Sequence, residues 1–205
     1  MVATPVRARR SDGDRSRAAI LDAAARLATV EGLEGLSIGR LADYIGMSKS
    51  GLYAHFGSKE ELQLAAIDTA ASIFTAEVID PARAADGALA RLEALCDSFL
   101  SYVEREVFPG GCFFAAVSAE LDSHPGAVKE KLRELQRAWL DLLERRVGAA
   151  QEAGELDPAE DAGQLAFELN AMCAMGNAVF VLQGDPNALE RARRGFLARL
   201  AVAAS

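Results

Sequence analysis

The sequence is poor in the residue types that catalysis, metal binding and disulfide scaffolds require. It has two histidines, three cysteines and one tryptophan, and its aromatic content is 6%. Cys96, Cys112 and Cys173 are widely spaced and form no CxxC pair, so neither a disulfide framework nor a zinc site is supported. We expect reduced thiols in packed helices.

Catalytic motifs are equally scarce. The two histidines are His55 and His124, which cannot supply a Ser-His-Asp triad or a histidine-based metal site in the C-terminal part. Gly110-Gly111 lacks the following Lys and Ser or Thr of a phosphate-binding loop. The sequence therefore predicts no catalytic residue, no metal ligand and no cofactor.

Long hydrophobic runs and alternating strand patterns are also missing. No run of eighteen apolar residues occurs, and no apolar segment follows the basic N-terminus to form a signal peptide. We therefore expect a cytoplasmic protein with no membrane partner. Hydrophobic residues make up 51% of the 205 residues and recur at helical spacing, which predicts an all-α fold of about nine helices.

Charge is distributed unevenly along the chain. The formal net charge is −8, yet residues 1–59 hold nine Lys or Arg against six Asp or Glu. This asymmetry indicates that the basic N-terminal part faces nucleic acid and that the rest of the chain forms an acidic domain. The alternative is that Arg7, Arg9 and Arg10 merely keep the tail soluble.

Helix-breaking residues, mainly glycine and proline, divide the chain into three parts. Residues 1–13 are predicted to be a disordered basic arm, residues 14–57 a three-helix domain, and residues 58–205 a longer helical domain. In the second part a helix over 14–30 precedes two short helices, which Ser37 and Ser48 can cap. Two short helices joined by a tight turn predict a helix-turn-helix. Ser58 and Glu61 then form a capping box that starts a helix to about Asp80.

The stretch from Ser37 to Leu62 carries a more specific pattern. It contains SIGRLA, then GMSKSGLYAHF and the capping turn GSKEEL. Together these resemble the signature of the tetracycline-repressor (TetR) family. The resemblance implies a homodimeric, sequence-specific repressor that binds double-stranded operator DNA and is released by a small-molecule effector. It also implies that residues 14–57 are the DNA-binding domain and residues 58–205 the effector-binding and dimerisation domain.

The resemblance also implies roles for individual residues. Ser48, Lys49, Ser50 and Gly51 would lie at the DNA groove, and the phosphates would be contacted by Ser37, Arg40, Tyr53, His55 and Lys59. Leu41, Leu52 and Phe56 are expected to form the core of this small domain. Ser50-Gly51 departs from the glycine-threonine pair that the family often has there. The alternative is that Tyr53 and His55 are packed side chains and that the two lysines are merely solvated.

The remaining helices are predicted over 86–107, 112–121, 127–153, 159–183 and 187–203. The helix over 159–183 is apolar nearly all round, so it must be covered on two sides. In the family the last two helices of each subunit form the dimer interface; an ordinary core within the chain is the alternative. Residues expected to line an effector cavity are Phe74, Phe99, Tyr102, Phe113, Trp139, Asn170, Met172, Cys173 and Asn177. The apolar members of this set could be plain core, and the two asparagines could face the dimer seam.

The absence of charge from that set predicts a neutral, apolar or weakly polar effector. Two other functions remain open from the sequence. One is a DNA-binding regulator without small-molecule control, which a fully packed body would favour. The other is an all-α enzyme with an incidental helix-turn-helix, which would need a cluster of ionisable groups in a cleft.

Overall fold

The structure, a computed structural model, describes residues 6–121 and 125–204, with side chains for 16–120 and 125–204. Within these ranges the chain is helical and has no strand. The elements are α1 (Val6–Gly35), α2 (Ile38–Ile45), α3 (Lys49–Tyr53), α4 (Lys59–Phe74), the π-helix η1 (Thr75–Ile79), α5 (Asp80–Arg83), α6 (Ala88–Glu104), α7 (Phe113–Leu121), α8 (Ala127–Glu152), α9 (Ala162–Gln183) and α10 (Asn187–Ala203). Because α4, η1 and α5 run on without a break, the described residues form nine helices in space, as the sequence predicts.

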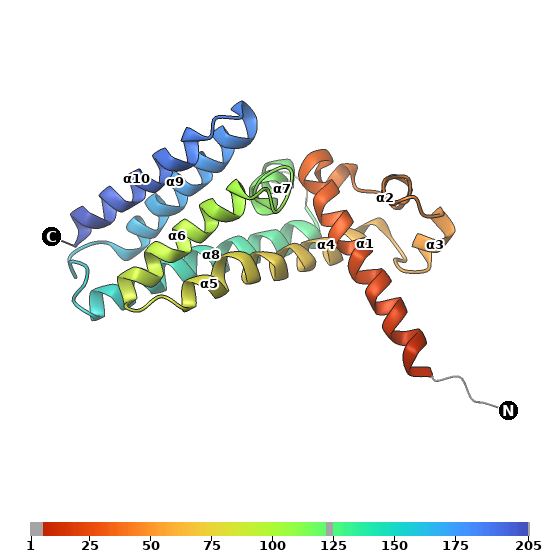
Figure 1. Cartoon of the computed structure of the whole chain (residues 1–205), viewed down its shortest axis with the longest axis horizontal. Coiled ribbons are helices and arrows are strands. Elements are labelled where there is room, and N and C mark those ends of the chain that lie inside the picture. The colour runs from red at the N-terminus through yellow and green to blue at the C-terminus, as the bar shows by residue number, and fades with distance from the viewer. Residues whose placement is uncertain (1–5, 122–124, 205) are drawn as a thin grey trace.

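The molecule has a small head and a longer helical body. Figure 1 shows α1, α2 and α3 at one end, and α9 and α10 side by side at the other, where the C-terminus lies. Helix α4 starts beside the head and continues through η1 and α5 along the body. The body therefore has a helix that reaches directly from its interior to the head.

The head is held together by the apolar residues that the sequence assigns to its core. Leu41 of α2 and Leu52 of α3 are fully buried, Phe56 is 1% exposed, and Ile20 of α1 is 3% exposed. Burying a side chain of this size contributes about 1.5–3 kcal/mol. The core interpretation of Leu41, Leu52 and Phe56 is confirmed.

The first helix begins earlier than predicted and is broken close to its predicted end. It begins at Val6, so residues 6–13 of the expected disordered arm are helical, while residues 1–5 lie outside the described part. Arginine and alanine have high helix propensity, which favours an earlier start. At the other end Gly32 adopts φ 79° and ψ 162°, which breaks the helix and turns its last residues toward α2.

The helix that starts at Lys59 also ends later than predicted. The sequence places its end before Pro81, but the chain continues as η1 and α5 to Arg83. Pro81 lies in α5, which follows directly after the π-helix η1, so the chain stays helical past a residue that cannot donate to the preceding turn. By contrast, α10 spans the predicted residues 187–203.

Helices α9 and α10 pack closely within the chain. A Cβ atom on Gly176 would lie 2.8 Å from the Cβ of Ala192, so only glycine allows this approach. The arginine face of α10 is tied to the same subunit: Arg193 pairs with Asp97 at 2.6 Å, and Arg199 with Glu168 at 2.6 Å. One side of α9 is therefore covered by its own chain.

Two stretches, Lys59–Arg83 and Ala162–Gln183, are long and apolar enough to cross a membrane by length and composition. A core helix of a soluble protein passes the same test. Both contribute several residues to the hydrophobic core, including Ile67, Phe74, Leu169 and Cys173.

Candidate nucleic-acid interface and effector cavity

The helix-turn-helix is built from local hydrogen bonds. The Ser37 hydroxyl accepts from the Arg40 backbone N–H at 3.1 Å, and the Ser48 hydroxyl accepts from Gly51 N–H at 3.1 Å. Gly46 ends α2 in the left-handed conformation with φ 68°. These caps fix where each short helix starts and stop α2 before the turn.

The short helix α3 presents its first turn and one aromatic side chain to solvent. Ser48, Lys49 and Ser50 are exposed, Gly51 is half-buried, and Tyr53 is 60% exposed. A buried, structural Tyr53 is therefore ruled out. Ser48 caps α3, and Lys49, Ser50, Gly51 and Tyr53 belong to it. Leu52 of the same helix is buried.

Gly39 lets the Lys49 side chain lie across α2. A Cβ atom on Gly39 would be 3.5 Å from Lys49 Cε and 3.6 Å from its Nζ, which is ordinary contact distance. Gly39 lies inside α2, where glycine lowers helix stability. The Lys49 side chain therefore leaves room for a methyl group at position 39.

We expect Gly39→Ala to raise the free energy of unfolding by about 0.5–1 kcal/mol. Alanine loses less backbone freedom than glycine, and the flexible Lys49 chain tolerates the added methyl group. Thermal melting of the two proteins measures the change. Gly46→Ala is the control and should lower stability, because its φ of 68° strains a non-glycine residue. A fall in melting temperature for Gly39→Ala would contradict this account of α2.

Two cations that the sequence assigns to phosphates are engaged with carboxylates of α1. Arg40 donates to Glu31, with Nε 2.7 Å from Oε2, and this hydrogen bond lowers the pKa of Glu31 and raises that of Arg40. Lys59 Nζ donates to the Glu34 carbonyl at 2.7 Å and lies 3.0 Å from Glu34 Oε2. Both lysine and carboxylate are about half exposed, and such surface pairs contribute only about 0–1 kcal/mol. Exchanging Glu34 for a phosphate therefore costs little.

Arg17 is a residue of the head that sequence reasoning missed. Its guanidinium donates to the His55 carbonyl and lies 4.5 Å from the centre of the Phe56 ring. The half-buried His55 is thus held through its backbone at the end of the helix-turn-helix. An arginine on an amphipathic helix gives no sequence signal for such a contact, because its partner is 38 residues away.

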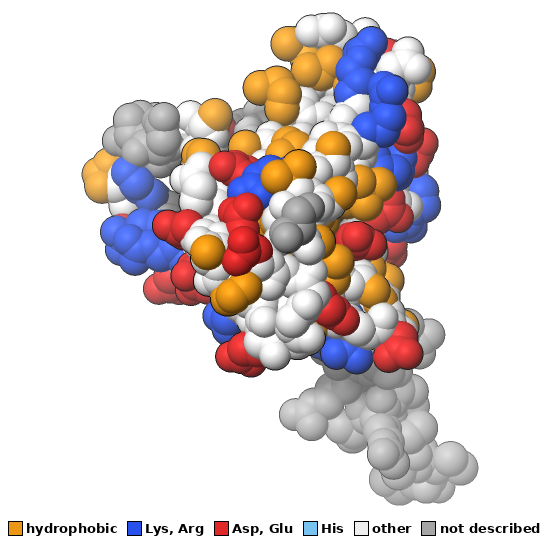
Figure 2. All heavy atoms as spheres, turned by 90° about the vertical axis from the view of Figure 1, so that its left-hand side faces the viewer, with side chains coloured by type: hydrophobic (Ala, Val, Ile, Leu, Met, Phe, Trp, Pro, Cys, Tyr) orange, Lys and Arg blue, Asp and Glu red, His pale blue; other side chains and the backbone are white. Residues whose placement is uncertain are grey.

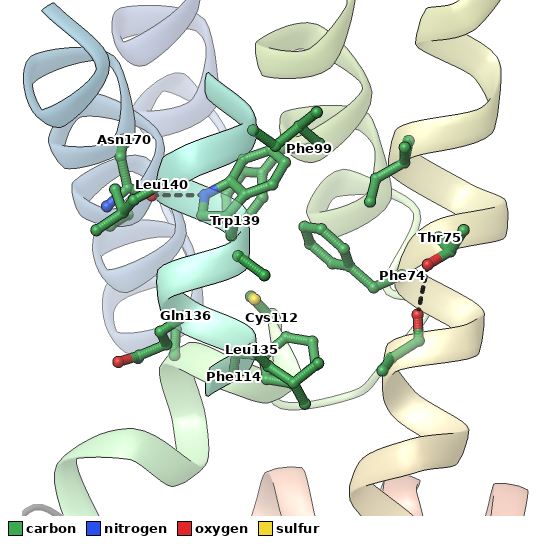
Figure 3. A pocket seen from close by; sticks show the side chains of 16 residues that line it. Phe74, Thr75, Phe99, Cys112, Phe114, Leu135, Gln136, Trp139, Leu140 and Asn170 are labelled. Atoms are coloured by element: carbon green, nitrogen blue, oxygen red, sulfur yellow. Dashed lines mark hydrogen bonds between the residues drawn. The ribbon is translucent and has the colours of Figure 1, made fainter. Parts of the chain in front are cut away.

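The body contains a partly open cavity of about 420 Å³ (Figure 3). This volume is within the usual range for sites that bind small molecules. Its lining comes from α4, η1, α6, α7, α8, α9 and the residue before α7: Ala71, Phe74, Thr75, Ile79, Phe99, Cys112, Phe114, Ala115, Leu135, Gln136, Ala138, Trp139, Leu140, Leu142, Asn170 and Ala174. Figure 3 shows the Cys112 sulfur in the space between Trp139 and Phe74. A fully packed body is therefore ruled out.

Four of the nine residues expected at the cavity line it: Phe74, Phe99, Trp139 and Asn170. Aromatic rings form much of the wall. The Phe74 ring lies 5.1 Å from that of Trp139 in an edge-on arrangement, and Phe99 stacks on Trp139 at 6.3 Å. The Asn170 side-chain oxygen accepts from the Trp139 indole N–H at 2.9 Å, which fixes the indole in place.

The other five expected residues lie outside the lining. Phe113 and Tyr102 are buried in the core. Phe113 precedes the lining residue Phe114, so its side chain points about 100° away from the cavity around the axis of α7. Cys173 packs against Cys96, whose pKa is raised by their hydrogen bond and by burial. Met172 lines a separate groove of about 500 Å³ between α9 and α10.

Asn177 is the fifth of these residues, expected near Asn170 because the two are seven residues apart. It does share that face of α9, but it lies about 10 Å further along the helix axis. Its side-chain oxygen accepts from the Cys112 backbone N–H at 2.8 Å. Both asparagines therefore satisfy groups of their own chain.

The cavity carries no ionised side chain among its lining residues. Burial raises the pKa of Cys112 to about 11, so its thiol stays protonated at neutral pH. The polar groups are Thr75, Gln136 and Asn170, and each has a hydrogen-bond partner in the protein. Among the described side chains, those of residues 16–120 and 125–204, no three His, Cys, Asp or Glu gather to hold a metal ion.

Comparison with known proteins identifies both parts of the chain. Residues 20–66 match the family described as "Bacterial regulatory proteins, tetR family", and residues 88–196 match "Tetracyclin repressor-like, C-terminal domain". The HTH-type transcriptional regulator LmrA of Bacillus subtilis is 31% identical over 142 residues, which are 67% of this chain and 73% of LmrA. The chain belongs to the TetR family.

Solved TetR-family structures share the whole architecture. A TetR transcriptional regulator from Chloroflexus aurantiacus superimposes with a TM-score of 0.86 at 27% identity, covering 93% of this chain and 96% of that one. A TetR-family regulator from Cytophaga hutchinsonii gives 0.83 at 22% identity, covering 94% and 96%. AibR, solved with isovaleryl coenzyme A and operator DNA, gives 0.71 at 24% identity, covering 92% and 98%. TetR-family regulators bind DNA through the helix-turn-helix, so this chain is a DNA-binding transcriptional regulator.

Proposed function

We propose that this TetR-family chain is a homodimeric cytoplasmic repressor with no catalytic role, released from its operator when a neutral, mostly apolar molecule fills the body cavity. The observation that carries the proposal is the aromatic-lined and uncharged cavity, which is open to solvent on one side. AibR, a protein of the same fold, has been solved with both a small molecule and operator DNA. A ligand that enters this cavity would exchange water for aromatic surface, which favours apolar molecules.

At the operator, we assign base contacts to the first turn of α3 and phosphate contacts to its surroundings. Ser48, Lys49, Ser50 and Gly51 would enter the major groove. Ser37, Arg40, Tyr53, His55 and Lys59 would meet the phosphates, with Arg40 and Lys59 leaving Glu31 and Glu34. The two heads of the dimer would reach half-sites about one DNA turn apart.

Helix α4 supports the link between the cavity and the head. Phe74 and Ala71 near its end line the cavity, while Lys59 at its start holds Glu34 of α1. Gln63, buried in the same helix, donates to the Leu33 carbonyl at 2.6 Å. From Lys59 to Phe74 the helix spans about 22 Å. A ligand that displaces α4 in the body would therefore shift the head, and with it the half-site spacing.

The test uses N-phenyl-1-naphthylamine, a neutral apolar fluorophore, and the DNA duplex that the protein selects from a random pool. Trp139 is the only tryptophan in the sequence and lines the cavity, so binding should quench its emission. The same probe should weaken DNA binding by about 5- to 150-fold. Ala71→Phe, which fills part of the cavity, should prevent quenching and response while keeping DNA affinity.

Ala153→Phe is the matched control, since Ala153 is exposed at the end of α8. It should leave both probe binding and response unchanged. If the probe binds at Trp139 without changing DNA affinity, effector control through this cavity is wrong. A regulator without small-molecule control then becomes the better description.

A further inference from the structure

The end of α1 is held by a carboxylate from the body. Because Gly32 breaks the helix, the N–H groups of Leu33 and Glu34 point away from the regular hydrogen-bond ladder. The Glu120 carboxylate of α7 accepts from both, with Oε2 2.7 Å from Leu33 N and Oε1 2.8 Å from Glu34 N. The carboxylate thus caps the last residues of α1 with two charge-assisted hydrogen bonds.

The geometry at this junction depends on Gly32 in two ways. Its φ of 79° is a conformation that favours glycine, and it directs the two N–H groups toward α7. A Cβ atom at this position would lie 2.6 Å from Glu120 Oε1. The carboxylate therefore occupies space that any side chain at position 32 would take.

The other end of α7 forms part of the cavity wall. Phe114 and Ala115 line the cavity, and the Phe114 ring packs edge-on against Phe74 at 5.7 Å. From Phe114 to Glu120 the helix rises about 9 Å. One short helix therefore touches both the cavity and the end of α1.

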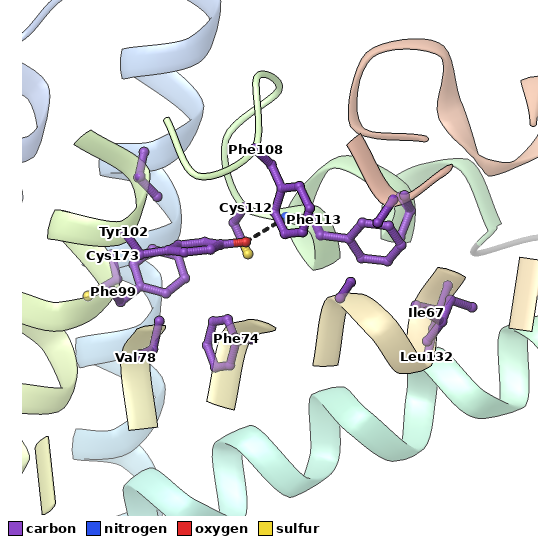
Figure 4. Packing of buried hydrophobic residues seen from close by; sticks show 14 of the residues in the cluster. Ile67, Phe74, Val78, Phe99, Tyr102, Phe108, Cys112, Phe113, Leu132 and Cys173 are labelled. Carbon is purple, nitrogen blue, oxygen red and sulfur yellow. Dashed lines mark hydrogen bonds between the residues drawn. The ribbon is translucent and has the colours of Figure 1, made fainter. Parts of the chain in front are cut away.

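The start of α7 is pinned to the body by separate contacts. The Phe113 N–H lies 3.4 Å from the Tyr102 hydroxyl, and the Cys112 N–H donates to Asn177. Figure 4 shows the Tyr102–Phe113 contact in the middle of the hydrophobic core. A push on Phe114 therefore pivots α7 about its fixed start, and the movement is largest at its far end, where Glu120 lies.

The end of α1 leads directly into the DNA-binding helices. Leu36 is fully buried and donates its N–H to the Leu33 carbonyl at 3.2 Å, and Ser37 then caps α2. Only a short stretch of backbone therefore separates the atoms that Glu120 holds from the first turn of α2. A displacement at Leu33 must move α2 with it.

We propose that Glu120 couples the cavity to the helix-turn-helix by holding the end of α1 in the position that suits the operator. The proposal adds a second route, through α7, to that of α4, and it rests on the proposed effector response. A ligand that pushes Phe114 draws Glu120 away from Leu33 and Glu34. The end of α1 and the helix-turn-helix then lose their position relative to the body.

The first experiment compares wild-type protein with Glu120→Gln, using N-phenyl-1-naphthylamine and the selected duplex. The glutamine NH₂ group cannot accept a hydrogen bond, so one backbone N–H loses its partner. We expect the wild-type loss of DNA affinity on adding probe, about 5- to 150-fold, to fall below twofold in the variant. The dissociation constant of the probe, measured by Trp139 quenching without DNA, should stay within twofold.

Glu130→Gln is the control, because it removes the same charge from an exposed ion pair with Arg133 on α8. It should keep the wild-type response. A role of Glu120 in folding alone would lower the melting temperature but leave the ratio of DNA affinities unchanged. If Glu120→Gln does not fold, Glu120→Asp retains the charge, withdraws the carboxylate by one methylene and should show the same loss of response.

A second experiment needs no small molecule. Phe114→Ala changes the cavity wall on α7, and its effect on DNA affinity is measured first in the wild-type background and then in the Glu120→Gln background. We expect a change of at least about fivefold in the first background and less than twofold in the second. Equal changes in both backgrounds, or no change in either, overturn the coupling role of Glu120.

The two experiments separate the inference from the proposed function. If the probe leaves wild-type DNA affinity unchanged but the Phe114 effect depends on Glu120, effector control is wrong and the coupling stands. If the probe acts equally on wild type and Glu120→Gln, effector control stands and the coupling is wrong.

Discussion

The double variant Tyr53→Ala, Lys59→Ala is expected to bind operator DNA on the order of 10²–10³-fold more weakly than wild type. A homodimer would lose four phosphate contacts, each contributing about 1 kcal/mol net. The loss should be similar for operator and random DNA, because phosphates carry no sequence information. Losing one cation per subunit should also lower the slope of log affinity against log salt by about 2.

Neither substitution is expected to disturb the fold of the protein. Tyr53 is 60% exposed and Lys59 holds an exposed pair with Glu34, so neither substitution leaves a hole in the core. Fluorescence anisotropy at several salt concentrations measures both affinity and slope. Lys131→Ala is the control, since Lys131 pairs with Asp68 in the body, away from the helix-turn-helix. Unchanged operator affinity in the double variant would remove these residues from the DNA interface.

The helix-turn-helix could be predicted from the sequence because its signals are local. Ser37, Ser48 and Ser58 each accept from an N–H three residues later, so the caps are readable in the order of residues. The contact that holds the end of α1 is the counterexample. Glu120, which accepts from the Leu33 N–H, lies 87 residues away, and no spacing rule connects two such positions.

The cavity was predictable only in part, for a geometric reason. Helical spacing groups residues on one face, as it does for Phe99 and Tyr102, but it does not say how far along the axis a cavity extends. Tyr102 lies one turn beyond Phe99 and is buried in the core, with its hydroxyl beside Phe113. Burial there raises the pKa of Tyr102 well above its ordinary value. Aromatic type and spacing thus place a residue inside the body without separating wall from core.

The outer face of α9 explains why this helix is apolar nearly all round. Phe167, Met175 and Leu182 are 61%, 63% and 85% exposed, and Ala171 and Ala178 between them are also exposed. Spacings of three and four residues put all five on one side of the helix. The opposite side, with Gly176, faces α10 of the same chain.

The neighbouring helix extends this apolar surface. Leu197 and Val202 of α10 are 41% and 68% exposed, and the groove of about 500 Å³ between α9 and α10 includes Met172 and Met175. Figure 2 shows hydrophobic side chains gathered at the top of the view, toward the connection between these helices. An exposed apolar patch of this kind marks an association surface. A second copy of the chain is the expected partner, since dimers are typical of the TetR family.

Met175→Arg is therefore expected to convert a dimer into a monomer. Met175 lies in the middle of the exposed face of α9, and in a twofold interface the two arginines would be desolvated without partners. Sedimentation at micromolar concentration should give twice the 21.7 kDa chain mass for wild type and the single mass for the variant. The variant should also lose operator affinity by at least about 100-fold, because only a dimer engages two half-sites. Ala153→Arg, exposed at the end of α8, is the control and should remain dimeric. A wild-type protein that sediments at 21.7 kDa, or a Met175→Arg protein that stays dimeric, would contradict the assignment of this face.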